Sequence, residues 1–174
     1  MSRRRIAEGT LAVLFIAGLI VIALQIAEHL AESAAEERAI SASKRWGGRV
    51  AYVGVARDLP NWINKSLPHS YPLRYLDLGK TQVTDEGLKE FAELINWQTI
   101  LLKGTIVTDA GLKELAGQRS LQKLDLSYTK VTDAGIEELA GLLSLLSLDL
   151  TNTRVTELGV MKLRKALPEC HIVH

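Results

Sequence analysis

The sequence predicts an α/β solenoid, a stack of repeated strand–helix units, behind an N-terminal transmembrane helix. Two observations predict this architecture. A 24-residue pattern repeats four times without a gap over residues 73–168, and an uncharged run of sixteen residues, 9–24, lies near the N-terminus. The chain has 174 residues and a formal net charge of +1. This near-neutral balance does not favour nucleic acid as a partner, because nucleic-acid binding relies on an excess of basic residues.

The N-terminal segment has the length and composition of a membrane span. About 20 apolar residues in a helix cross the roughly 30 Å of hydrocarbon in a bilayer, and residues 6–27 hold only Glu8, Thr10 and Gln25 as notable polar positions. Three arginines precede the span at residues 3–5, and glutamates dominate the segment that follows it. The positive-inside rule therefore places residues 1–5 in the cytoplasm and the repeats outside the cell membrane.

Two other interpretations of this segment stay open. The three arginines and residues 11–24 also fit a cleaved signal peptide, although Gln25 stands where a small residue would precede cleavage after Ala27. A buried helix of a soluble protein rarely runs this long without a charge. The next residues, 28–45, are rich in alanine and glutamate and predict a helical, solvated stalk.

Each repeat opens with three apolar residues in the spacing LxxLxL. The four sets are Leu73, Leu76 and Leu78; Trp97, Ile100 and Leu102; Leu121, Leu124 and Leu126; and Leu145, Leu148 and Leu150. A threonine is then expected to cap each helix, and the acidic residue after it places a carboxylate at the positive end of the helix dipole. These caps are Thr84, Thr108, Thr132 and Thr156, followed by Asp85, Asp109, Asp133 and Glu157.

The repeated text LxxLDLxxTxVTDxGLxxLAxL resembles leucine-rich repeats of the ribonuclease-inhibitor-like or cysteine-containing type, especially those of bacterial membrane-anchored envelope proteins. The resemblance implies a parallel sheet on the concave side, helices on the convex side, and a protein-binding role without a named ligand. It also gives threonines 81, 105, 129 and 153 a structural role at the end of each strand. Residues 46–72, with a strand at 49–55 and a helix behind Pro60, resemble an N-terminal cap, and residues 169–174 a C-terminal capping strand.

The predicted binding surface is the row of strand residues that alternate with the buried leucines. Its members are Tyr75, Asp77, Thr99, Leu101, Lys103, Lys123, Asp125, Ser147, Asp149 and His171. Leu101 is expected to form an apolar spot between two aspartates. Since aspartate between two leucines is common in such repeats, these aspartates are also interpretable as repeat filler.

No catalytic site, metal site or cofactor is predicted. The ionisable residues follow the repeat and do not converge, and an SxxK pattern at residues 41–44 has no companion motif. On a strand, Cys170 and His174 share one face about 13 Å apart while His171 points to the other face, which opposes shared metal ligation. The predicted function is a membrane-anchored interaction module for a protein or envelope polymer. The alternative is a cytoplasmic or secreted adaptor similar to the repeat part of ubiquitin-ligase receptors.

Overall fold

The computed structural model describes residues 3–52, 73–94 and 96–174. The chain divides into two compact units, Met1–Ala35 and Glu36–His174. One helix, α1 (Arg3–Trp46), forms the first unit and supplies the first residues of the second. No helix in the described part of the chain is both long and apolar enough to cross a membrane. Much of the predicted span, residues 6–27, lies outside the residues whose side chains are described.

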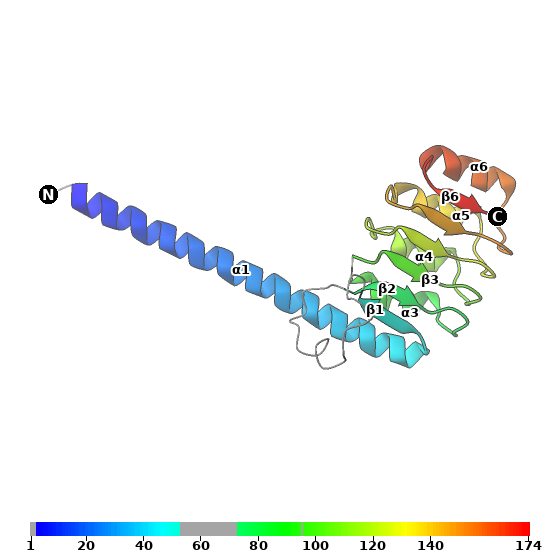
Figure 1. Cartoon of the computed structure of the whole chain (residues 1–174), viewed down its shortest axis with the longest axis horizontal. Helices are drawn as coiled ribbons and strands as arrows, with labels where there is room; N and C mark the ends of the chain where they lie inside the picture. Colours follow the sequence, from blue (N-terminus) through cyan, green and yellow to red (C-terminus); the bar gives the residue numbers. More distant parts are fainter. Residues whose placement is uncertain (1–2, 53–72, 95) are drawn as a thin grey trace, which may run out of the picture. The chain divides into compact units, whose positions relative to one another are not determined.

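Six short strands form one sheet in the order of the chain (Figure 1). They are β1 (Arg49–Tyr52), β2 (Leu73–Asp77), β3 (Thr99–Leu101), β4 (Lys123–Asp125), β5 (Ser147–Asp149) and β6 (His171–Val173). β1 is antiparallel to β2, and each later pair is parallel. The register advances by one repeat per strand, so that Leu76 faces Ile100 and Ile100 faces Leu124. The predicted α/β solenoid with a parallel sheet is confirmed.

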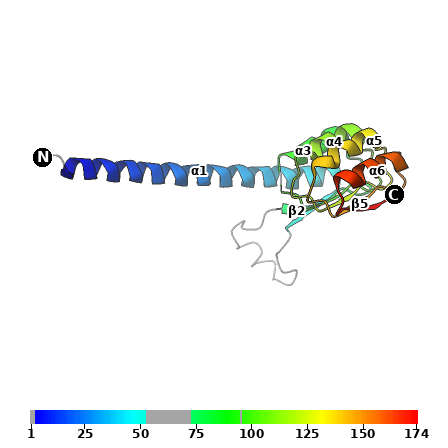
Figure 2. The same ribbon diagram turned by 90° about the horizontal axis from the view of Figure 1, so that it is seen from above.

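The helices cover one face of this sheet (Figure 2). They are α3 (Asp85–Ala92), α4 (Asp109–Leu115), α5 (Asp133–Glu137) with the 3-10 turn η1 (Glu138–Gly141), and α6 (Glu157–Ala166). Each helix begins after its predicted threonine cap; the Thr84 hydroxyl, for example, accepts from the Gly87 N–H at 3.3 Å. The inward residues of the strands, from Leu76 to Ile172, are buried beneath the helices. This burial is the main stabilising contribution in a stack of small units.

The threonine three residues before each helix cap holds the end of its strand, as predicted. Thr105 and Thr129 are buried, and their hydroxyls donate to the carbonyl oxygens of Leu102 and Leu126 at 2.8 and 2.6 Å. Thr81 and Thr153 make the same hydrogen bond in the outer repeats. Each bond satisfies a backbone acceptor that turns away from the sheet, and leaving such a buried group unsatisfied costs about 1–3 kcal/mol.

In the first three repeats, the aspartate after the helix cap joins one repeat to the next, a role that the sequence analysis did not assign. Asp109 accepts from the backbone N–H of Thr132 through Oδ1 and from the Thr132 hydroxyl through Oδ2, both at 2.7 Å. The pairs Asp85–Thr108 and Asp133–Thr156 repeat this arrangement. Hydrogen bonds from Thr156 hold the pKa of Asp133 below its usual value. Because the pKa is lowered on folding, this link stabilises the fold at neutral pH and weakens as the pH falls through the lowered pKa.

The same aspartates explain the glycine that recurs three residues after each helix cap. A Cβ atom on Gly111 would lie 2.5 Å from Oδ1 of Asp85, and one on Gly135 would collide with Oδ1 of Asp109. Gly159 stands in the same relation to Asp133. The carboxylate of one repeat therefore occupies the space beside the helix of the next, and only glycine leaves that space open.

The last turns of α1 complete the N-terminal end of the repeat unit. At Gly87 the atoms nearest to an added Cβ belong to Val83, at 2.8 Å, and to the indole ring of Trp46, at 2.9 Å, instead of to an aspartate. Trp46 also donates from Nε1 to Glu90 at 3.1 Å. Ala39 and Ala42 are buried. Residues 36–45, predicted as part of a solvated stalk, therefore belong to the folded unit, because their alanines allow close packing.

β1 supplies the outer strand at this end, within the region predicted for a strand at 49–55. The remainder of the predicted cap, including Pro60 and Trp62, lies outside the described residues.

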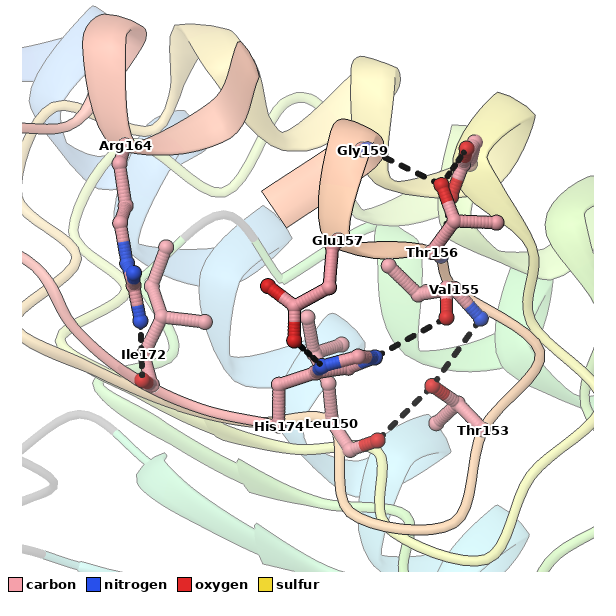
Figure 3. Close-up of polar contacts among 10 residues, drawn as sticks. Leu150, Thr153, Val155, Thr156, Glu157, Gly159, Arg164, Ile172 and His174 are labelled. Carbon is pink, nitrogen blue, oxygen red and sulfur yellow. Dashed lines mark hydrogen bonds and ion pairs between the residues drawn. The ribbon is translucent and has the colours of Figure 1, made fainter. Parts of the chain in front are cut away.

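His174 contacts Val155 and Glu157 of the fourth repeat (Figure 3). In an earlier repeat, the corresponding contacts come from the repeat that follows it. The Nε2 of His174 lies 3.0 Å from the Val155 carbonyl oxygen, and its Nδ1 lies 3.4 Å from Glu157. In the preceding repeat, the Val131 carbonyl accepts from the Arg154 N–H at 2.9 Å. Arg164, where earlier repeats have alanine, donates to the Ile172 carbonyl at 3.4 Å. The residues that depart from the repeat pattern, Glu157, Arg164 and His174, therefore lie together at one end of the stack.

Candidate binding surface

The sheet register gathers the predicted binding residues into two rows on the sheet face opposite the helices, which we call the open sheet face. The first row contains Tyr75, Thr99, Lys123, Ser147 and His171; the second contains Asp77, Leu101, Asp125 and Asp149. Lys103 follows the second row just beyond β3 and is exposed. Neighbouring strands lie about 4.8 Å apart, so each row is a continuous strip of side chains. All ten residues are partly or fully accessible to solvent.

The three aspartates of the second row also hold the turns that follow their strands. Oδ1 of each carboxylate accepts from a backbone N–H two residues later: Gly79 for Asp77, Ser127 for Asp125 and Thr151 for Asp149, at 2.9–3.0 Å. The Ser127 hydroxyl adds a 2.6 Å hydrogen bond to Asp125. The aspartates are therefore structural residues of the repeat that still present negative charge on the open sheet face.

Arg49 neutralises one of these charges and was missed by the sequence analysis. Its guanidinium lies 2.8 Å from Oδ2 of Asp77, and the hydrogen bond and charge of Asp77 raise the pKa of Arg49. The antiparallel register of β1 and β2 places the two residues opposite each other. In the part of the chain that the structure describes, Asp125 and Asp149 make no ion pair. The negative charge of the face is therefore concentrated on the third and fourth repeats.

Leu101 takes the place of aspartate in the second repeat and is half-buried. The register puts it beside Asp77 on one strand and Asp125 on the other. Lys103 lies two residues further, with its ammonium 5.3 Å from the centre of the Tyr128 ring, which is close enough for a cation–π contact. Tyr128 was not among the predicted binding residues because it lies beyond the strand, where the alternation of sides no longer applies.

The C-terminal residues weighed as metal ligands lie on β6 and directly before and after it. Cys170 is buried, and burial raises the pKa of its thiol, whereas His171 is exposed at the end of the first row. His174 is engaged with Val155 and Glu157. The side chains therefore point to different surroundings.

Comparison with known proteins shows a resemblance for two of the four repeats. A family model described as "Leucine Rich repeat" matches residues 69–92 and 117–140, which include β2 with α3 and β4 with α5. No curated protein matches the chain.

Solved structures also resemble it. The Chaetomium Mex67:Mtr2 subunits share 19% identity over 52% of this chain and 69% of theirs, with a TM-score of 0.44. A leucine-rich-repeat protein of Leptospira interrogans shares 22% identity over 49% of this chain and 27% of its own, with a TM-score of 0.38. At these scores neither structure bears on the role of this chain.

Proposed function

Because its repeats are leucine-rich repeats, we propose that this chain is a non-catalytic interaction module that binds a protein or an envelope polymer on the open sheet face. The observation that carries the proposal is the alignment of nine solvent-accessible side chains in two rows on a face without helices, with Lys103 just beyond the second row. The rows combine an apolar side chain at Leu101, cations at Lys103 and Lys123, and anions at Asp125 and Asp149. A mixed surface of this kind is typical of protein interfaces.

The rows favour binding over catalysis because their ionisable groups are spread along the sheet. Lys123 and Asp125 lie two residues apart on β4, and Asp149 faces Asp125 from β5. His171 lies on β6, at the far end of the first row. A catalytic site instead brings a nucleophile, a base and an electrostatic stabiliser around one reacting atom. The proposal therefore assigns no substrate, metal or cofactor to this face.

The proposal also includes a membrane anchor at residues 6–27, with the repeats outside the cytoplasm, as in bacterial envelope proteins with ribonuclease-inhibitor-like repeats. The apolar composition of this segment and the arginines before it support the anchor. Ile20, Val21, Leu24 and Ile26 each expose more than half of their surface on α1. A run of exposed apolar side chains on a helix favours contact with lipid.

A reporter enzyme that is active only outside the cytoplasm, fused after His174, tests the anchor. We expect activity, because the arginines at residues 3–5 retain the N-terminus on the cytoplasmic side. A paired fusion of a reporter active only in the cytoplasm is the control and should be silent. The reverse result would favour the cytoplasmic adaptor instead.

Site-specific photo-crosslinking in native membranes tests the open sheet face. A photoreactive residue at Thr99 is expected to capture a defined partner that the same residue at Lys113, on α4, does not capture. The triple variant Asp77→Asn, Leu101→Thr and Asp125→Asn should abolish capture from position 99. Asparagine keeps an oxygen acceptor for the turn N–H and removes the charge, so the fold should be retained.

The matched control for this variant changes the same chemistry on the helices: Glu86→Gln, Leu158→Thr and Glu138→Gln. All three side chains are exposed there. We expect undiminished capture. Equal capture by the two triple variants would show that the binding site does not lie on the open sheet face.

A further inference from the structure

A second surface lies beside the open sheet face, on the loops that lead from each parallel strand to the next helix. We define these ascending loops as residues 78–84, 102–108, 126–132 and 150–156. We infer that the ascending loops bind an acidic peptide segment that also carries apolar side chains. This inference goes beyond the proposed function, because it concerns the loops, which share only Lys103 with the predicted binding residues, and a partner of stated chemistry.

Positive charge is segregated on the ascending loops. Each loop contains one cation, and the four loops contain no aspartate or glutamate. The cations are Lys80, Lys103, Lys130 and Arg154, and all four are exposed. The acidic residues that follow the first three loops are already engaged as acceptors for the threonine of the next repeat. Four positive charges thus line one edge of a chain whose formal net charge is only +1.

Several cations elsewhere in the repeat unit pair with a neighbouring carboxylate. Arg45 pairs with Glu90 at 2.9 Å, and Lys162 pairs with Glu137 at 3.2 Å. In the ranges that the structure describes, none of the four ascending-loop cations makes an ion pair. The charge of this edge is therefore available to a ligand, and the sign of the ligand must be negative.

Backbone hydrogen bonds fix the loops against one another. The Lys80 N–H donates to the Lys103 carbonyl at 2.7 Å, and the Tyr128 N–H donates to the Thr151 carbonyl at 2.9 Å. The Gly104 N–H bonds to the Ser127 carbonyl at 2.8 Å in the same way. Adjacent loops are thus spaced as strands are, about 4.8 Å apart. The loops that carry the four cations are therefore pre-organised, so that ligand binding costs little further ordering of their backbone.

Apolar side chains stand among these cations. Tyr128 and Ile106 expose 55% and 41% of their surfaces. Lys80 and Tyr128 both adopt a φ of 59°, where Gly104 in the equivalent position adopts 66°. The chain thus presents long side chains at a backbone conformation that suits glycine better.

This mixture fits a peptide better than it fits nucleic acid or a lipid surface. Carboxylates of a peptide can meet the row of cations while an apolar residue packs on Tyr128 and Ile106. Single-stranded nucleic acid is bound on several stacking aromatic residues within a strongly basic groove, and the four loops contain one aromatic residue.

Fluorescence anisotropy with two synthetic peptides tests the inference on the full-length chain in a neutral detergent. One peptide alternates glutamate and leucine, and the other replaces each glutamate with glutamine. We expect the acidic peptide to bind at least about tenfold more tightly, since four exposed charge pairs each contribute a few tenths of a kcal/mol or more. Its affinity should fall as salt is raised.

Two variants of equal net charge separate this edge from a general effect of charge. The loop variant carries Lys80→Gln, Lys103→Gln, Lys130→Gln and Arg154→Gln; the helix variant carries Lys89→Gln, Lys113→Gln, Lys162→Gln and Lys165→Gln. All eight positions are exposed, so both should remain folded by circular dichroism. The loop variant should lose the tenfold preference, and the helix variant should keep it. Equal affinities of the two variants would overturn the inference, as would tighter binding of an oligonucleotide or of anionic vesicles through the same cations.

Discussion

Replacing Leu126 with alanine is expected to lower the free energy of unfolding by about 2–5 kcal/mol. Leu126 is the last apolar residue of its LxxLxL set and has no exposed surface. It lies in the third repeat, and its N–H bonds to Asp149 of the fourth. The truncation therefore leaves a cavity where two repeats stack. In a solenoid each repeat contacts only its neighbours, so a cavity of this size weakens the coupling along the stack.

Urea denaturation followed by circular dichroism measures this loss, with Lys123→Ala as the control. Lys123 lies three residues earlier on the same repeat but is exposed on the open sheet face. Its replacement should change the free energy of unfolding by no more than about 0.5 kcal/mol. Equal losses in the two variants would contradict the assignment of the buried and open faces of β4.

The elements set by local spacing could be predicted from the sequence. Periodic leucines define the buried side of each strand, and the threonine caps define the start of each helix, because both depend on residues a few positions apart. The two rows of the open sheet face followed from the same alternation. Leu76 facing Ile100 and Asp77 facing Leu101 confirm that the repeat length had been identified correctly.

Contacts between repeats were beyond this reasoning. The hydrogen bond from Thr132 to Asp109 joins residues 23 positions apart. The aspartate already had an explanation within its own repeat, because its carboxylate lies at the positive end of the helix dipole. One signal was nevertheless present. The fourth repeat alone has glutamate, Glu157, in place of aspartate, and Glu157 meets His174 instead of a threonine. The replacement of aspartate by glutamate in the fourth repeat therefore coincides with a different contact partner.

The ends of the stack were the least predictable part. The alanines of residues 36–45 suit a solvated helix and a packed helix equally well, and the burial of Ala39 and Ala42 together with the position of Trp46 beside Gly87 decides between them. Arg49 was missed because its partner, Asp77, lies 28 residues away on an antiparallel strand. Ion pairs of this kind depend on register rather than on spacing within one element.

Replacing Gly135 with alanine is expected to cost about 1–3 kcal/mol of stability, as overpacking of a tight contact usually does. The added methyl group would collide with Oδ1 of Asp109 and lie 2.9 Å from its Cγ. The carboxylate must then move away from Thr132, to which it makes two hydrogen bonds. One substitution therefore adds a steric clash and weakens the link between the second and third repeats. Thermal and urea unfolding of the full-length chain measure the loss.

Gly141→Ala is the matched control, because a Cβ atom at Gly141 would meet nothing within 4 Å. That variant should be as stable as the wild type or slightly more so, since alanine restricts the unfolded chain. A double-mutant cycle then identifies the cause. Asp109→Ala alone loses the bonds to Thr132, but in its presence Gly135→Ala no longer meets the carboxylate and should cost less than it does alone. Strict additivity of the two losses would show that the glycine is required for some reason other than the aspartate beside it.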